Sequence, residues 1–349
     1  MRRRTGIFLM KKAGFLKQNL KQFVSKYDTI AVSHSEGGIP LAKRRRNGGG
    51  GALMELVFIL MAIVIFLAAW IAWKGEELPL PEITGKKAPE PVIFTREDAE
   101  PVELWARCGC TAEVEPLLLT DLNWNLQGDG PRVLIIHTHA TECYTETGAD
   151  FAEYEEFRTL DETHNMIAVG EALTGALERG GIQVIHDTGV YDYPDYDMAY
   201  DSTRALVQGY LTQYPSIQLV LDVHRDSVEL EDGGQWAPTA TVNGKESAQL
   251  MLVVGTACDE NNNPAWRTNL SVAVKLQAQL EKMYPGFCRE VELLSSRYNQ
   301  DLLGASLLVE IGMSGNTLEQ AKVCAETLAE GILAISGGAR AAAEEDPPA

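Results

Sequence analysis

Apolar positions along this chain form two kinds of pattern, and the first is a single long run. The residues ALMELVFILMAIVIFLAAWIAW, from Ala52 to Trp73, carry one charge, Glu55. This length matches the roughly 20 residues that a helix needs to cross a bilayer. A cleaved signal peptide would have a shorter apolar core nearer the N-terminus. We therefore predict one transmembrane helix over residues 51–74.

The second pattern begins at Pro131, where short apolar runs alternate with segments of helical spacing. The runs VLIIHTH, IQVIHD, IQLVLDVHRD, AQLMLVVG and LLVEIG predict strands, and residues 163–180, 200–214, 269–283 and 317–335 predict helices. Such alternation is typical of βαβ units with parallel strands. The predicted fold class over residues 131–337 is α/β, with a mainly parallel, mixed sheet and helices on both faces.

Charge changes the picture on either side of the apolar run. The formal net charge is −19, yet residues 1–50 are rich in Lys and Arg and include the cluster Lys43–Arg46. The positive-inside rule places this basic arm in the cytoplasm and the rest of the chain outside the cell membrane. The acidic C-terminal portion argues against nucleic acid as a partner, because phosphate binding depends on Lys and Arg.

Two further segments are predicted to lie outside the folded domain. Residues 75–130 begin with the Pro- and Glu-rich stretch LPLPEITGKKAPEPVIF, which favours an extended linker, and residues 103–126 are a candidate docking segment within it. Residues 338–349 are predicted to be a disordered tail. The six cysteines have no spacing typical of a disulfide framework or a structural zinc site, so most are expected to be small buried residues.

Candidate chemistry lies at the ends of the predicted strands. His137, His139 and His224 end apolar runs, while His186 and His164 are assigned no role in the site; acidic residues accompany them at Glu142, Asp226 and Glu310. Imidazoles together with a carboxylate are the ligands of a catalytic Zn²⁺, which keeps one position open for water. Glu310 is the candidate acid and base. A structural hydrogen-bonded histidine network is the alternative.

Several strings of this sequence resemble one family over residues 131–335. HTHATECY, DETHNMIAVGEALTGALERGGIQVIHD, LDVHRDS and LLVEIGMSGNTLEQA are similar to the stage II sporulation protein P family of endospore-forming bacteria, itself distantly similar to zinc-dependent N-acetylmuramoyl-L-alanine amidases. The resemblance implies zinc ligands at His224, at Glu162 opening a helix, and at His139, with His137 as the alternative to His139. It implies catalysis by Glu310. Cys143 departs from the family pattern.

The resemblance also implies a substrate and a setting. The expected activity is hydrolysis of the amide between N-acetylmuramic acid and L-alanine in peptidoglycan, with cleavage of stem-peptide crosslinks in addition. The expected context is engulfment during sporulation, with a glycan-cleaving partner and a membrane partner. Two alternatives stay open: a zinc endopeptidase acting only on crosslinks, and a catalytically inert wall-binding or recruitment module.

Overall fold

The computed structural model describes residues 89–145, 157–258 and 263–342. All of these residues belong to one of the two parts into which the chain divides, residues 85–349. The predicted cytoplasmic arm and transmembrane segment lie outside the described residues. Within the part that the structure describes, no helix has the length and apolar character that crossing a bilayer requires.

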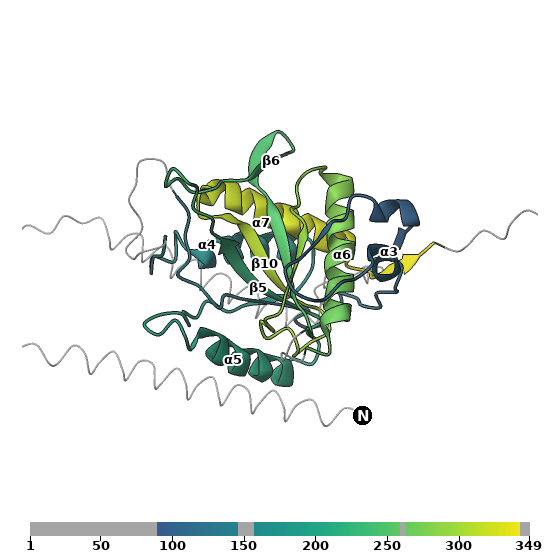
Figure 1. Cartoon of the computed structure of the whole chain (residues 1–349). Coiled ribbons are helices and arrows are strands. Elements are labelled where there is room, and N and C mark those ends of the chain that lie inside the picture. Colours follow the sequence, from purple (N-terminus) through teal and green to yellow (C-terminus); the bar gives the residue numbers. More distant parts are fainter. Residues whose placement is uncertain (1–88, 146–156, 259–262, 343–349) are drawn as a thin grey trace, which may run out of the picture. The chain divides into compact units, whose positions relative to one another are not determined.

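A seven-stranded sheet forms the centre of this unit, with the strand order β2-β9-β8-β10-β5-β3-β4 (Figure 1). Five of its six strand pairings are parallel, and β10 with β8 is the antiparallel one. The prediction of a mainly parallel, mixed sheet is therefore confirmed. The strands are β2 (Leu104–Ala106), β3 (Val133–Ile136), β4 (Val184–His186), β5 (Leu219–Asp226), β8 (Leu250–Gly255), β9 (Val291–Leu294) and β10 (Ser306–Met313).

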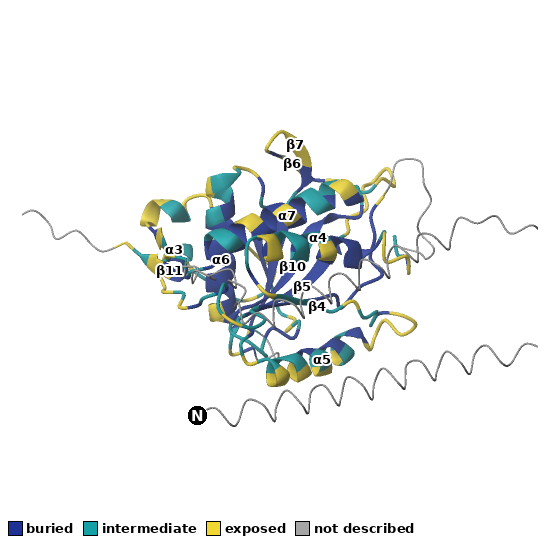
Figure 2. Ribbon diagram, turned by 180° about the vertical axis from the view of Figure 1, so that it is seen from behind, coloured by how far each residue is buried: buried dark blue, intermediate teal, exposed yellow. Residues whose placement is uncertain are grey.

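Helices cover both faces of the sheet (Figure 2). Alternate side chains of β5 point to opposite faces of the sheet. Leu219 and Leu221 belong to the large core on one face, whereas Val220 packs on the other face in a smaller cluster with Val207 of α5 (Ala199–Gln213). This alternation is what a strand buried on both faces requires. The large core contains side chains of α4 (Met166–Arg179), α6 (Trp266–Met283) and α7 (Leu318–Ala334), while α5 covers the opposite face.

Capping residues fix where α4 begins. The Asn165 side chain accepts a hydrogen bond from the Ile167 amide, which satisfies one of the free N–H groups at the helix start. Asn165 is therefore the N-cap, and residues 162–164 form the turn before the helix. The family resemblance implied that Glu162 opens this helix. Glu162 instead lies in the turn before α4, which begins four residues later at Met166.

The predicted linker is wrong for residues 89–130, which fold onto the domain. β1 (Val92–Phe94) pairs with β11 (Ala339–Ala341), and a 3₁₀ turn follows β1 at Arg96–Ala99. β2 extends the central sheet, and a short helix, α3 (Val114–Leu118), packs near α6. Phe94, Leu118 and Leu126 are fully buried. Residues 338–342 likewise belong to the fold. Each short element buries at most two side chains, so the sequence shows no periodicity there.

A hairpin extends from the domain beyond the predicted elements. β6 (Thr239–Val242) and β7 (Lys245–Ala248) are antiparallel and joined by Asn243 and Gly244. Both turn residues have positive φ, 51° and 77°. Asn-Gly is the pair that favours this backbone in two-residue hairpin turns.

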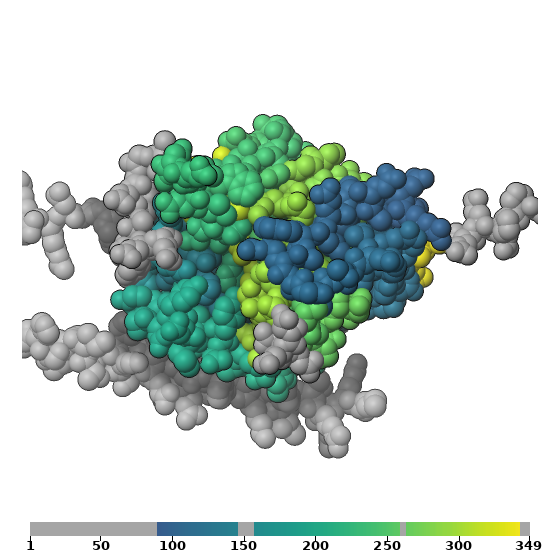
Figure 3. All heavy atoms as spheres, in the orientation of Figure 1, coloured from purple at the N-terminus to yellow at the C-terminus, as the bar shows by residue number. Residues whose placement is uncertain are grey.

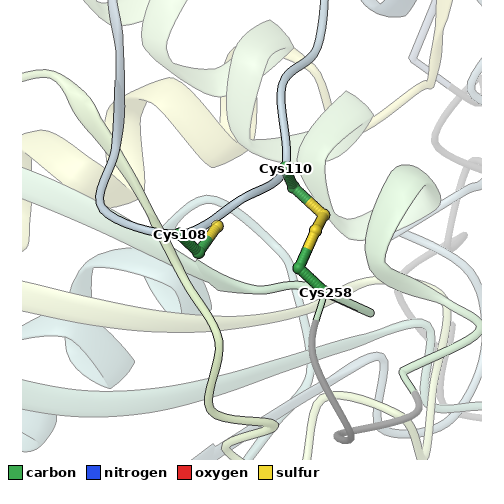
Figure 4. A group of neighbouring side chains, drawn as sticks. All are labelled: Cys108, Cys110 and Cys258. Atoms are coloured by element: carbon green, nitrogen blue, oxygen red, sulfur yellow. A yellow bond between two sulfur atoms is a disulfide. The ribbon is translucent and has the colours of Figure 1, made fainter.

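A disulfide joins Cys110 to Cys258, with Cys108 close to it (Figure 4). The cysteine spacing indicated no disulfide framework, and this pair was not predicted. The two partners are 148 residues apart in the sequence, so no local spacing could reveal the pair. The Cys108 thiol lies 3.6 Å from the Thr256 hydroxyl. Cys143 and Cys324 are buried thiols, as expected.

Replacing Cys110 with Ser should lower the free energy of unfolding by about 2–4 kcal/mol, because the disulfide restricts a very long loop of the unfolded chain. Denaturation with urea under non-reducing conditions measures the change. Cys108→Ser is the matched control, since Cys108 is a free thiol beside the bond. Equal stability of wild type and Cys110→Ser without reductant would contradict the assigned pair.

Candidate active site

The carboxyl ends of β3, β5 and β10 meet at one edge of the sheet, where ligands bind in open α/β folds. β10 lies parallel to β5, and Glu310 is in register with His224. Registered residues of neighbouring strands point to the same side of a sheet. Val220 packs against α5, and His224, four residues later on the same strand, points to the same face because side chains of a strand alternate. His224 and Glu310 therefore lie on the face of the sheet that α5 covers.

The centre of the site is a cluster of His139, Glu142 and His224. One ligand atom from each lies within 4.8 Å of the other two, and all three residues are buried. His139 Nδ1 is 3.5 Å from Glu142 Oε1, and His224 Nδ1 is 3.5 Å from Glu142 Oε2. The structure therefore brings together two of the histidines that the sequence singled out, around a carboxylate from the loop after β3.

Glu142 is a buried carboxylate that keeps its negative charge. Burial alone would raise its pKa, but the Arg225 guanidinium and the two histidines lower it well below its usual range. The Arg225 amide also donates a hydrogen bond of 3.1 Å to Glu142 Oε2. Arg158 lies 3.7 Å from Glu142 Oε1. The carboxylate is thus ionised and ready to bind a cation.

Asp222 stands behind His224 on the same strand. Its Oδ1 is 2.9 Å from His224 Nε2, a close charge contact without the angle of a hydrogen bond. Asp222 accepts hydrogen bonds from the Thr138 amide and hydroxyl, at 2.8 and 2.6 Å. Although burial opposes it, the two carboxylates Asp222 and Glu142 raise the pKa of His224 well above its usual value. Asp222 therefore sets the orientation of the imidazole.

Glu310 is the second carboxylate at this edge. Its Oε2 is shielded from solvent and has no hydrogen-bond partner among the described residues. Burial raises the pKa of Glu310 to about 8, and the neighbouring Glu142 charge adds to the rise. A buried polar atom without a partner is costly, and such atoms commonly mark a functional site. Glu310 is positioned to exchange a proton with a bound molecule.

Aromatic side chains surround His139. The Tyr196 ring stacks on His139 with centroids 4.5 Å apart, and the Tyr200 ring meets it edge-on at 5.5 Å. The Arg158 guanidinium lies 4.8 Å from the centre of the Tyr196 ring and donates to Asp192 at 3.0 Å. These contacts hold the His139 ring in place at the mouth of the site.

The structure separates His137 from His139. His137 Nδ1 contacts the Val223 carbonyl at 2.9 Å, and its Nε2 contacts His186 Nε2 at 2.9 Å. Burial, together with the His186 charge, lowers the pKa of His137 to about 3. β3 ends at Ile136 and the chain turns there, so the two histidines have different surroundings. His139 is therefore the one positioned for a metal.

Glu162 does not join the cluster. It is exposed, in the turn before α4, and next to it Asp161 Oδ2 contacts His164 Nδ1 at 3.0 Å. The carboxylate that the structure offers in its place is Glu142, three residues after His139. The close spacing in HTHATE could have indicated it. Asp222 was also missed, although it precedes His224 by two residues and so shares its side of β5.

The residues present fit a zinc ion. Two imidazoles and one carboxylate form a three-ligand set that leaves a fourth position open, as catalytic zinc sites do. Asp222 supplies the carboxylate that commonly supports a ligating histidine. The unpartnered oxygen of Glu310 is a further donor or base at the same place.

A mixed α/β domain with such a His–carboxylate cluster at its strand ends is the architecture of a candidate metallohydrolase. The profile of the family described as Stage II sporulation protein P matches residues 83–333, and the chain belongs to this family. The family resemblance predicted from the sequence is thereby confirmed. Stage II sporulation protein P of Bacillus subtilis (strain 168) is 32% identical over 219 residues, which cover 58% of this chain. The chain spans about half of that relative, 50%.

Solved structures of amidases show a weaker likeness. An N-acetylmuramoyl-L-alanine amidase of Nostoc punctiforme is 13% identical with a TM-score of 0.34, covering 59% of this chain and 97% of that one. An N-acetylmuramyl-L-alanine amidase from Mycobacterium smegmatis is 12% identical with a TM-score of 0.35, covering 61% and 99%.

The two candidate carboxylates can be compared directly. Glu142→Gln should lower the content of bound divalent metal at least about tenfold, because a charged ligand is lost, whereas Glu162→Gln should leave it unchanged. Elemental analysis of the two purified full-length variants after dialysis measures the difference. Loss of metal in Glu162→Gln, with full retention in Glu142→Gln, would overturn the assignment.

Proposed function

We propose that this protein is a zinc-dependent peptidoglycan hydrolase that cleaves the amide between N-acetylmuramic acid and L-alanine. One observation carries the proposal: the buried cluster of His139, Glu142 and His224 has the unpartnered carboxyl oxygen of Glu310 beside it. Membership of the Stage II sporulation protein P family supports the cell wall as substrate and sporulation as setting.

His139, Glu142 and His224 would hold the zinc, which when bound polarises the scissile carbonyl and makes a neighbouring water more acidic. Glu310 Oε2 takes the proton of the attacking water and passes it to the leaving nitrogen. Burial raises the pKa of Glu310 to about 8, so its carboxylate holds a proton more readily than an exposed glutamate does. Glu310 therefore serves as base and then as acid.

The remaining groups of the centre position these residues. Thr138 fixes Asp222, and Asp222 in turn fixes the His224 ring. Arg225 holds the Glu142 carboxylate from its backbone amide. Rigid support of this kind keeps catalytic groups aligned at no cost during the reaction.

We further propose that the domain acts outside the cytoplasm, anchored by the apolar segment 51–74. The disulfide between Cys110 and Cys258 supports this location, because such bonds persist in oxidising compartments. A glycan-cleaving partner and a membrane partner during engulfment belong to the same proposal, which rests on the family.

Glu310→Gln should lower hydrolysis of purified peptidoglycan sacculi at least about 100-fold and leave the metal content unchanged, because only the proton-transfer group is lost. Release of soluble fragments and elemental analysis give the two readouts. His224→Ala is the matched control and should lose both metal and activity. Full activity of the Glu310→Gln variant would favour the alternative that this protein is a catalytically inert module and that a contaminating hydrolase causes the activity. Loss of metal from the same variant would indicate that Glu310 is a metal ligand.

The bond that is cut determines the products. Amidase action should release intact stem peptides and leave glycan strands without peptides, whereas a crosslink endopeptidase leaves the peptides on the glycan. Mass spectrometry of digested sacculi separates the two. Products that all retain muramic acid joined to alanine would contradict the amidase assignment.

A further inference from the structure

A groove of about 860 Å³ lies at the same edge of the sheet as the candidate active site. β8, β9 and β2 run opposite to β10 and β5, so their amino ends lie where β5 ends. Residues at those ends line the groove: Gln249 before β8, Arg289 before β9 and Glu103 before β2. Asp226, two residues after His224 on β5, also lines it. The groove therefore begins beside the candidate active site.

Two tryptophans stand exposed in this groove, each with an arginine stacked on it. Trp105 is 43% exposed, and the Arg107 guanidinium lies 4.9 Å from its ring centre. Trp236 is 40% exposed, and the Arg289 guanidinium lies 5.0 Å from its ring centre. Figure 3 shows the blue surface that includes β2 lying against the green surface of the later chain at the front of the molecule. The two tryptophans come from segments far apart in the sequence.

Carboxylates hold both arginines in position. Arg107 donates a 3.0 Å hydrogen bond to Glu292, and Arg289 donates a 2.9 Å hydrogen bond to Asp226. Each tryptophan therefore has an arginine against its ring, and a carboxylate holds that arginine in position. An aromatic ring supported in this way loses little conformational freedom when a ligand binds against it.

Exposed aromatic rings combined with fixed polar groups are typical of a ligand site. A pyranose ring has an apolar face of C–H groups and a rim of hydroxyls. A tryptophan face matches the first, and charged hydrogen-bonding groups match the second. The volume falls within the roughly 300–1,000 Å³ of small-ligand sites, which admits a short oligosaccharide.

The charge of the groove selects a neutral ligand. Only Arg107 and Arg289 among its lining residues are cationic, and both are paired with carboxylates. The acidic side chains outnumber them: Glu103, Asp226, Glu281, Glu290 and Glu292. Such a surface repels carboxylate-rich peptide stems and phosphate-bearing polymers. An uncharged N-acetylhexosamine chain meets no such repulsion.

We propose that this groove binds uncharged saccharide units of the glycan strand, with Trp105 and Trp236 as stacking platforms, and so presents the strand to the active site. This deepens the proposed function and rests on it for the identity of the strand. The groove is then the part of the protein that distinguishes polymeric wall from a small fragment.

Binding can be measured without hydrolysis by titrating a β-1,4-linked N-acetylglucosamine hexamer, which has no stem peptide, into the full-length protein in detergent micelles. Calorimetry should detect binding that Trp105→Ala or Trp236→Ala weakens about tenfold, equivalent to about 1.4 kcal/mol. Trp236→Tyr should restore most of the affinity. Ile93→Ala, which removes another exposed apolar side chain that does not line the groove, should leave the affinity unchanged.

Activity separates the groove from the active site. On sacculi, the Trp→Ala variants should raise KM about tenfold and keep kcat, while cleavage of a single muramoyl-peptide should stay at the wild-type rate. Glu310→Gln should bind the hexamer like the wild type. If the Glu310→Gln variant stays active and still binds the hexamer, the proposed catalytic role of Glu310 is wrong and the groove assignment is retained.

Three outcomes would overturn the groove assignment while leaving the hydrolase intact. One is the absence of hexamer binding by the wild-type protein, and another is equal affinity in both Trp→Ala variants. The third is displacement of the hexamer by a short lysine-rich peptide with tighter binding at the groove, which would make the acidic lining a site for a basic protein segment.

Discussion

The buried carboxylate of Glu142 is the constraint on which the arrangement of this site depends. An unpaired charge inside a protein costs several kcal/mol, so the surrounding chain has to supply compensation from several directions. Arg225 does so from β5 through its guanidinium and its amide, and two imidazoles lie 3.5 Å away. This carboxylate joins the loop after β3 to the end of β5, and a hydrogen bond from the Arg225 side chain to the Cys143 carbonyl joins the same two segments. A cation bound there would strengthen the same attraction.

The alternation of apolar runs was enough to predict the fold around that charge. β5 and β10 are long and apolar, and their ends carry His224 and Glu310, so their meeting at one edge followed from the rule for parallel strands. The same reasoning singled out both His137 and His139, and it did not decide between them. The strongly periodic helices α4, α6 and α7 also matched, because each packs a continuous apolar stripe on the sheet.

The remaining features depend on contacts that no local pattern contains. The choice between Glu142 and Glu162 rests on where α4 starts, and that is set by the Asn165 cap. The Cys110–Cys258 bond and the Arg107–Glu292 pair join residues 148 and 185 positions apart. Arg289 contacts Trp236 and Asp226, which are also distant from it in the sequence. The family resemblance implied a glutamate ligand at Glu162, which is exposed, whereas the buried cluster contains Glu142.

The pairing of β1 with β11 has a consequence for how this unit can be cut from its chain. Leu122 and Ala339 exchange backbone hydrogen bonds of 2.8 and 3.0 Å, and the Trp124 indole donates to the Ile335 carbonyl at 2.7 Å. Residues 92–124 and residues 335–341 therefore hold each other in place through backbone and side-chain hydrogen bonds, an arrangement called the terminal clasp below. A fragment trimmed to residues 131–337 would lose both halves of the terminal clasp and an edge strand, leaving apolar surface bare. Useful excision boundaries lie outside Val92 and Ala341.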